Sequence, residues 1–368
     1  MTRAGIATAV AAGLAAMAVA ACQALAGIAE THFRAPDAGS SVDPDAARDA
    51  GEHLEDASSD VYTCVQLPSA PEGGPGGDAD AGSQPMVVVL RDLDLGLVTP
   101  EAPPLGVDLD CDHDCKASCV PPRPDVCVRA GLDNSLRRAL LRLKGKIPNP
   151  DIETRPHVQG GEASLVLKIT GYNGQQDDAD VGVEVLVSDG LMERAPDGGA
   201  RLPIWDGSRQ EWGLDDRFPS FVATRAYVTS GELIARFDAL AIPLAYGSGF
   251  AVFDLAETAV RARLRVGEEL TGEIVGRLPT APLLTTIARR HNCNLYEDSE
   301  LRQQFCAVAD MALRASQDRT GAACDALSFA ALFVAAPAAI GQLRTTRLPP
   351  PSAACIGLEF HDDCSNRE

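Results

Sequence analysis

Cysteine placement constrains the fold of this chain more than any other feature of its sequence. Ten of the eleven cysteines form two groups of five that lie far apart along the chain. They are Cys64, Cys111, Cys115, Cys119 and Cys127, and then Cys293, Cys306, Cys324, Cys355 and Cys364. An even set suits complete pairing into disulfides in an oxidising compartment. Because each group has an odd number, complete pairing requires at least one disulfide between the groups. We therefore expect the two ends of the folded region to lie close together.

The eleventh cysteine, Cys22, closes a segment with the features of a secretory signal. Met1-Thr2-Arg3 gives a short positive start, Ala4–Ala20 is almost uninterrupted apolar sequence, and small residues precede the cysteine. A bilayer-spanning helix needs about 20 apolar residues and is usually rich in larger ones than alanine. We therefore expect residues 1–21 to be a signal peptide and not a transmembrane helix.

The tetrapeptide Val19-Ala20-Ala21-Cys22 resembles the lipobox of bacterial lipoproteins. In that family the chain is cut before the cysteine after a diacylglyceryl group is added to its sulfur, which implies that Cys22 is the lipid attachment point. Several acyl chains hold a protein stably on a bilayer. Gln23 stands where an aspartate would retain some lipoproteins at the inner membrane, so the resemblance favours the outer membrane. It leaves open whether the protein faces the periplasm or the cell surface. An ordinary signal peptide with an incidental cysteine is the alternative.

Charge and composition restrict the partners of the chain. The formal net charge is −20, and residues 23–84 hold twelve acidic residues against Arg34 and Arg48. Phosphate binding requires a basic footprint, so we expect no nucleic acid partner and no attraction to anionic headgroups. The same region is built from Ala, Asp, Gly, Ser, Pro and Glu and has few large apolar residues. We predict that residues 22–84 are the lipidated cysteine and a disordered, flexible acidic tether.

Taken whole, the chain resembles the alanine- and arginine-rich envelope lipoproteins of Gram-negative bacteria of the myxobacterial kind. The lipobox, the acidic spacer and the cysteine-rich body carry this resemblance. It implies a location in the cell envelope and transfers no activity.

Alternating apolar residues predict a β-rich domain over residues 85–277. Met86–Leu90 is apolar and β-branched, and Ser164–Thr170 and Val181–Val187 alternate cleanly. Further strands are expected at Phe221–Thr229, Glu232–Ala241, Phe250–Leu255, Thr258–Arg265 and Glu269–Leu278. Short glycine turns join them, which favours an antiparallel sandwich or open barrel over a parallel sheet. One helix, over residues 133–144, is expected to begin at Asp133 or Asn134.

Residues 278–368 have a different pattern, which predicts a cysteine-rich helical cap stapled by disulfides. Helices are expected at Ala281–Arg289 and Ser299–Ala315. The apolar run Asp325–Ile340 is interpreted as a third, buried helix, because it is too short to span a bilayer and is interrupted by Pro337.

A cysteine-rich loop over residues 111–127 follows the densest polar cluster, Asp108-Leu109-Asp110-Cys111-Asp112-His113-Asp114-Cys115. Alternating aspartates are typical of calcium loops, but the glycine and glutamate that an EF-hand requires at its sixth and twelfth positions are missing. The cysteines and His113 offer zinc ligands without the usual paired spacing. We interpret these cysteines as disulfide partners.

Two other loops carry candidate ligands. Hard cations prefer oxygen ligands such as those of Asn173, Asp177, Asp178 and Asp180, which makes calcium the one cofactor that the sequence suggests. A solvated hairpin turn at Asn173-Gly174 is the alternative interpretation. An aromatic ring beside carboxylates is a common sugar site, which makes Trp212, Asp206 and Asp215 candidates. Burial of Trp205 and Trp212 in the core is the alternative there.

The sequence contains no catalytic signature on which an activity can be based. Ser248 in Gly247-Ser248-Gly249 lacks the spacing and the strand-to-helix context of a nucleophile elbow. The pattern favours a membrane-anchored envelope lipoprotein with a non-enzymatic binding or structural domain, whose partners are the bilayer and a glycan or envelope protein. A calcium-assisted carbohydrate-binding sandwich is the alternative, and a surface hydrolase is the second alternative.

Overall fold

The computed structural model describes residues 67–72, 85–98, 105–110, 118–120, 132–192, 202–246, 249–264, 269–290, 299–344 and 364. Residues 60–368 form one compact unit. The predicted signal peptide, Cys22 and most of the predicted tether lie outside the described residues. The same holds for Cys64, Cys111, Cys115, Cys127, Cys293 and Cys355.

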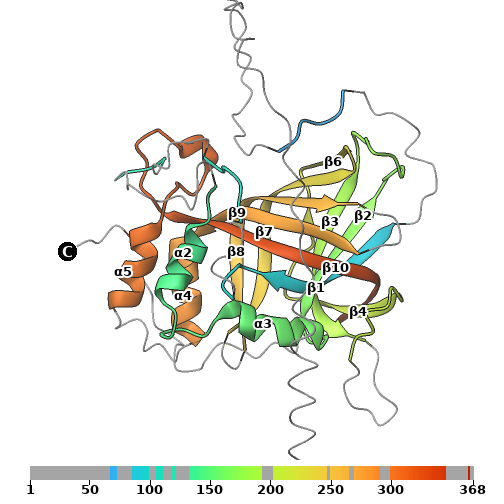
Figure 1. Cartoon of the computed structure of the whole chain (residues 1–368), viewed down its shortest axis with the longest axis horizontal. Coiled ribbons are helices and arrows are strands. Elements are labelled where there is room, and N and C mark those ends of the chain that lie inside the picture. Colours follow the sequence, from blue (N-terminus) through green and yellow to red (C-terminus); the bar gives the residue numbers. More distant parts are fainter. Residues whose placement is uncertain are drawn as a thin grey trace, which may run out of the picture. The chain divides into compact units, whose positions relative to one another are not determined.

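The described part of the chain is mainly β, as predicted (Figure 1). Its strands are β1 (Met86–Asp94), β2 (Ser164–Thr170), β3 (Gly182–Leu191), β4 (Gln210–Asp215), β5 (Phe221–Val222), β6 (Arg225–Thr229), β7 (Glu232–Tyr246), β8 (Gly249–Arg263), β9 (Leu270–Pro279) and β10 (Ala326–Arg344). They form one mixed sheet in the order β1-β2-β3-β4-β10-β9-β8-β7-β6, with β5 paired to β3. The expected antiparallel pairing holds throughout, except that β4 and β10 are parallel.

The sheet curls until its strands meet again. Strand β10 pairs with β9, with β4 and also with β1, so the first and last strands of the body lie side by side. At the other end of the row, Asp178 and Val228 exchange backbone hydrogen bonds of 2.9 and 2.7 Å, which joins β6 to the segment before β3. One apolar cluster has members from β1, β2, β3 and β6 to β10 and also from three helices, so the sheet and these helices share one core.

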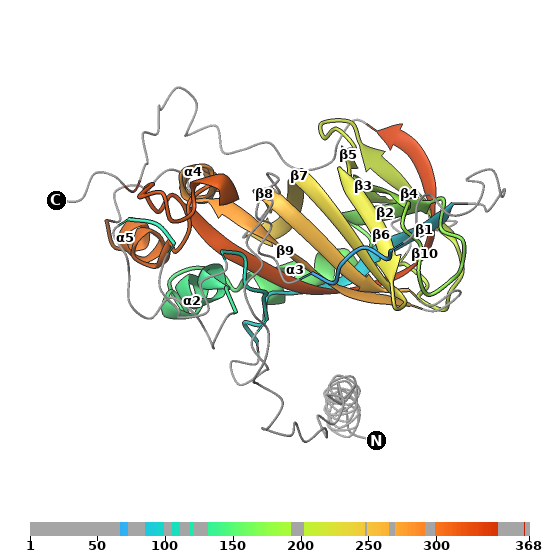
Figure 2. The same cartoon turned by 90° about the horizontal axis from the view of Figure 1, so that it is seen from above.

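Three of the four described α-helices gather at one end of the sheet, around the start of β10 (Figures 1 and 2). The helices are α2 (Ser135–Arg142), α3 (Pro150–Gln159), α4 (Thr280–Arg290) and α5 (Ser299–Val308), with a short 3₁₀ helix, η2 (Ala315–Gln317). Helix α2 begins as predicted, because Asn134 Oδ1 accepts a hydrogen bond from Arg137 N at 3.2 Å. None of the described helices is long and apolar enough to cross a membrane.

Helix α3 was not predicted from the sequence. Its apolar residues do not recur at helical spacing, and Pro156 lies inside it. What defines its start is local chemistry: Asn149 Oδ1 accepts a hydrogen bond from Asp151 N at 3.0 Å, and Pro150 occupies the first turn, where its missing N–H costs nothing. It packs against β1 and β7.

The prediction of a helix at Asp325–Ile340 is wrong. All of this segment after Asp325 lies in β10, a strand of 19 residues. Short apolar runs do not distinguish a buried helix from a strand that is buried on both faces. Here Ala326–Ala335 is almost entirely buried, which removes the alternation that would mark a strand. Strand β10 therefore returns the chain to the middle of the sheet, and the helix expected at Ser299–Ala315 ends at Val308.

The disulfide between the two cysteine groups is present. Cys119 and Cys324 are bonded across 205 residues of sequence, as the parity of the two groups requires. A second disulfide joins Cys306 to Cys364 within the C-terminal group.

The segment that enters the body attaches to it earlier than the sequence predicts. Leu67 packs against an apolar cluster that includes Val107 and Val275, and the hydroxyl of Tyr227 donates a hydrogen bond to the carbonyl of Pro68. The flexible tether predicted over residues 22–84 is therefore attached to the sheet at residues 67 and 68.

Candidate cation site

Three buried carboxylates meet beside the start of α2. One carboxylate oxygen from each of Asp108, Asp110 and Asp133 lies within 4.8 Å of the others. No other group of three His, Cys, Asp or Glu side chains in the described part of the chain is placed to hold a metal ion in this way. Each of the three residues is at most 8 % exposed. Carboxylate oxygens suit a hard cation such as calcium, so this is a candidate cation site.

Backbone pairing brings these residues together. Val107 and Asp133 form an isolated antiparallel bridge, with a hydrogen bond of 3.2 Å from Asp133 N to Val107 O. In addition, Leu109 N donates to Asp133 Oδ2 at 2.8 Å. Gly106 makes the close approach feasible, because its φ is +129° and a Cβ at this position would lie 2.4 Å from the carbonyl oxygen of Asp133.

A fourth carboxylate, Asp310, is buried next to this group. Its Oδ1 accepts hydrogen bonds from Ser135 Oγ at 2.8 Å and Ser328 N at 3.0 Å, and its Oδ2 accepts one from Ser328 Oγ at 2.6 Å. These contacts join the first residue of α2 to β10. They also place a further negative charge near Asp133.

Burial and like charge oppose ionisation in this region. Loss of water raises the pKa of Asp133 to about 8, and the charges of Asp310, Asp110 and Asp108 act in the same direction, while the hydrogen bond from Leu109 lowers it. Burial raises the pKa of Asp310 to about 6, opposed by the hydrogen bonds from Ser328 and Ser135. Burial and like charge therefore favour retention of a proton by this group of carboxylates near neutral pH. A bound divalent cation would instead neutralise the negative charges of these carboxylates.

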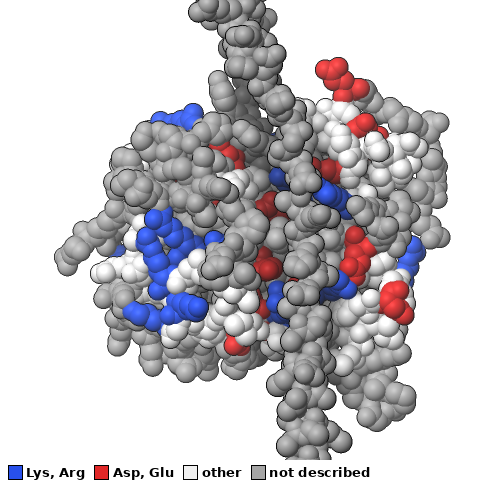
Figure 3. All heavy atoms as spheres, viewed as in Figure 1, with Lys and Arg blue, Asp and Glu red and all other residues white. Residues whose placement is uncertain are grey.

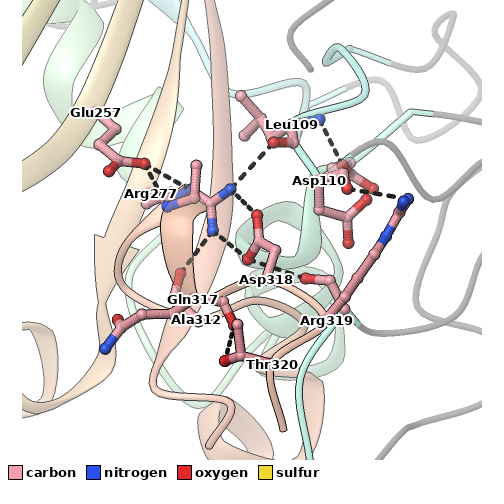
Figure 4. A network of polar contacts seen from close by, with 12 residues as sticks. Leu109, Asp110, Glu257, Arg277, Ala312, Gln317, Asp318, Arg319 and Thr320 are labelled. Carbon is pink, nitrogen blue, oxygen red and sulfur yellow. Dashed lines mark hydrogen bonds and ion pairs between the residues drawn. The ribbon is translucent and has the colours of Figure 1, made fainter. Parts of the chain in front are cut away.

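Arg277 links this region to two other parts of the body (Figure 4). Its side chain is buried, and its Nη1 donates to Ala312 O at 2.7 Å and to Asp318 Oδ1 at 2.8 Å. Its Nη2 donates to Leu109 O at 3.1 Å, which holds the carbonyl between Asp108 and Asp110. Its Nε lies 3.2 Å from Glu257 Oε2. A buried guanidinium with two carboxylate partners is costly to disturb, so this network makes the site rigid.

The segment 118–120 is attached to the same network. Ser118 O accepts a hydrogen bond from Arg319 N at 2.7 Å, and Ser118 Oγ donates to Asp318 Oδ1 at 3.2 Å. The next residue, Cys119, forms the disulfide with Cys324. Covalent and ionic links therefore hold the loop between α5 and β10 against the segments that carry the carboxylates.

The calcium candidates in the β2–β3 loop have a different role in the structure. Asp178 Oδ2 accepts a hydrogen bond from Asn173 N at 2.8 Å, and Asp178 Oδ1 accepts one from Asp180 N at 3.3 Å. Asp177 Oδ1 accepts one from Ser230 N at 2.8 Å, and Asn173 Oδ1 accepts one from Gln175 N at 2.7 Å. These oxygens stabilise the turn and its junction with β6, which favours the hairpin interpretation.

Trp212, the ring of the predicted sugar platform, lies in the core of the body. Trp212 is only 1 % exposed, because it packs in an apolar cluster with side chains of β1, β2, β3 and β10, and its ring stacks on that of Trp205 at 5.8 Å. Asp215 is buried and forms an ion pair of 2.9 Å with Arg217. Asp206 is exposed and accepts a hydrogen bond from Ser208 N at 2.9 Å. Trp212 is therefore a core residue, as the alternative interpretation held.

Sequence reasoning did not assign a cation to the three clustered carboxylates. Asp108 and Asp110 were noted for their spacing, whereas Asp133 was considered only as a helix cap, and the cap is Asn134. No sequence pattern indicated that Asp310 lies beside this group, because its position depends on how β10 packs. No protein-family model matches this chain, and no curated protein or solved structure is significantly similar to it. Its function must therefore be argued from its own residues.

Proposed function

We propose that the chain is an envelope lipoprotein, anchored to a membrane through acylated Cys22, whose β-rich body serves as a non-enzymatic binding or structural domain. The observation that carries the proposal is the lipobox-like tetrapeptide Val19-Ala20-Ala21-Cys22 at the end of a signal-like segment. The Cys119–Cys324 and Cys306–Cys364 disulfides support it, because disulfides persist in compartments outside the cytoplasm.

The body has features of a rigid scaffold. The clustered carboxylates of Asp108, Asp110 and Asp133 and the side chain of Arg277 are buried, and the hydroxyls of Ser135 and Ser328 are buried against Asp310. A nucleophile in such a position has no access to substrate. In the described residues, the geometry thus favours binding or support over hydrolysis.

Lipidation is tested with two matched variants. Cys22→Ser should abolish metabolic labelling with palmitate and release the protein from the membrane fraction. Gln23→Asp should keep the label and move the protein from the outer to the inner membrane fraction. If Cys22→Ser leaves both the label and the membrane association unchanged, the proposal fails.

Calcium-assisted binding is the second candidate, because the buried group of Asp108, Asp110 and Asp133 offers only oxygen ligands. Added Ca²⁺ should raise the melting temperature of the native protein, and Asp133→Asn should remove that increase. Asp178→Asn is the matched control in the β2–β3 loop and should retain it. If Ca²⁺ does not change melting, or if only Asp178→Asn removes the effect, this candidate is rejected.

A further inference from the structure

An acid-free basic segment interrupts the strongly acidic sequence of this protein. Between Asp133 and Asp151 there is no acidic residue, whereas five residues are basic. Two of the four lysines of the whole chain, Lys144 and Lys146, are among them. Half of the net charge of −20 comes from residues 23–84, so the negative charge of the chain is concentrated elsewhere.

Helix α2 turns these charges outward. Leu136, Ala139 and Leu140 are buried, since α2 packs against β10 and α5. Arg138 and Arg142 are four residues apart and therefore share one face of the helix, where Arg142 is exposed. Arg137 is excluded, because it is buried and its Nε donates to Gly96 O at 2.9 Å.

Lys144 and Lys146 extend the same surface beyond the end of the helix. Both are exposed, and they flank Gly145, which has a φ of +85° and open space where a Cβ would lie. Figure 3 shows lysine and arginine side chains gathered over α2, with no acidic side chain of the described residues between them in that view. We call Arg138, Arg142, Lys144 and Lys146 the basic patch.

The form of the patch indicates the kind of partner. Its charges project from a helix face and a turn, which suits a broad surface of phosphates. Residues 134–150 contribute no exposed large apolar side chain, so binding would be electrostatic, without insertion into the acyl region. Clusters of four or more Lys and Arg on a membrane-attached protein are typical of contact with anionic headgroups.

We propose that the basic patch binds the phosphate headgroups of an anionic bilayer and holds the body of the protein on the membrane surface. The choice of a bilayer as partner rests on the proposed anchoring at Cys22. Attachment at Cys22 would keep the body near the membrane and favour this second, weaker contact. The expectation from net charge alone, that the chain avoids anionic headgroups, is thereby revised for this one surface.

The test uses the full chain with Cys22→Ser, so that acylation does not contribute. Flotation is measured with vesicles of phosphatidylcholine and with vesicles of equal parts phosphatidylcholine and phosphatidylglycerol. We expect binding that requires phosphatidylglycerol and weakens at high salt. Each base near an anionic surface strengthens binding about fivefold, so Arg142→Glu, Lys144→Glu and Lys146→Glu together should weaken it about a hundredfold.

The control reverses three exposed arginines elsewhere on the body, Arg209→Glu, Arg263→Glu and Arg314→Glu. This control changes the net charge by the same amount. If binding depends on the position of the basic patch, the control should bind within about twofold of the protein that has only Cys22→Ser. Circular dichroism checks that both triple variants fold. Equal loss in both variants, or equal flotation with the two vesicle types, would overturn the proposal. Tighter binding to soluble polyglutamate than to vesicles would assign the patch to an acidic protein instead. None of these outcomes affects palmitate labelling at Cys22, which tests the anchoring separately.

Discussion

At the scale of single residues, the surroundings of a carboxyl group decide whether it carries a charge. Asp133, Asp310 and Asp151 have pKa values raised to about 8, about 6 and about 7, and burial is the largest cause for each. Asp151 differs in accepting two backbone hydrogen bonds of 2.7 Å, from Leu95 and Leu97, which tie α3 to the end of β1. In these three groups the native state holds protons that the unfolded chain releases.

This difference predicts how stability depends on pH. Between the ordinary carboxyl pKa of 3.8 and a native value of about 8, Asp133 binds a proton in the native state and not in the unfolded state. The free energy of unfolding should therefore fall as pH rises through this window, by up to about 1.4 kcal/mol per pH unit for one such group. Urea unfolding at a series of pH values measures it. Asp133→Asn should reduce this slope, and other buried carboxyl groups with raised pKa values, among them Asp310 and Asp151, should supply the remainder.

Glu211→Gln is the control for that prediction, because Glu211 is exposed on β4. It should leave the slope as in the native protein. A native protein whose stability rises steadily from about pH 5 to about pH 8 would contradict the raised pKa values.

At the scale of elements, local patterns predicted most strands and failed where tertiary packing decides. Val183, Val185 and Val187 alternate along β3, and each is buried as predicted. The first half of β10 is buried on both faces, so no alternation was available to distinguish it from a helix. The candidate site follows the same rule. Asp133 joins Asp108 only through the pairing of its backbone with Val107, which leaves no mark in sequence spacing.

Two asparagine caps provide a matched test at this scale. Asn149 caps α3 through a hydrogen bond to one backbone amide, so Asn149→Ala should cost about 1 kcal/mol of stability. Asn134 caps α2 and its Nδ2 also lies 3.4 Å from the carbonyl oxygens of Leu105 and Ala330. Asn134→Ala should therefore cost about 2 to 3 kcal/mol, since buried acceptors lose a donor. Equal costs in chemical unfolding would mean that Asn134 acts as a cap alone.

At the scale of the whole molecule, the spacing of the cysteines predicted a long-range link that no local pattern contains. The prediction needed only the odd number in each group, and Cys119–Cys324 fulfils it. The partner of each cysteine could not be predicted from the sequence, because pairing depends on which segments the curled sheet brings together. The link lies beside the network of Arg277 and Asp318, so the closure of the fold and the rigidity of the candidate site have one structural origin.

The two described disulfides should therefore differ in their effect on the site as well as on stability. Cys119 and Cys324 are 205 residues apart and Cys306 and Cys364 are 58 apart, and removing the longer link releases more chain entropy in the unfolded state. Cys119→Ala with Cys324→Ala should lower the free energy of unfolding by about 1 kcal/mol more than Cys306→Ala with Cys364→Ala.

Loss of the longer link should also release segment 118–120 from the loop that holds Asp318, admit water to Asp133 and flatten the pH dependence of stability. The Cys306 and Cys364 variant keeps those contacts and should retain the native slope. If both double variants show the same slope, the disulfide closes the fold without supporting the carboxylate group. The rigidity of the site would then depend on Arg277 alone.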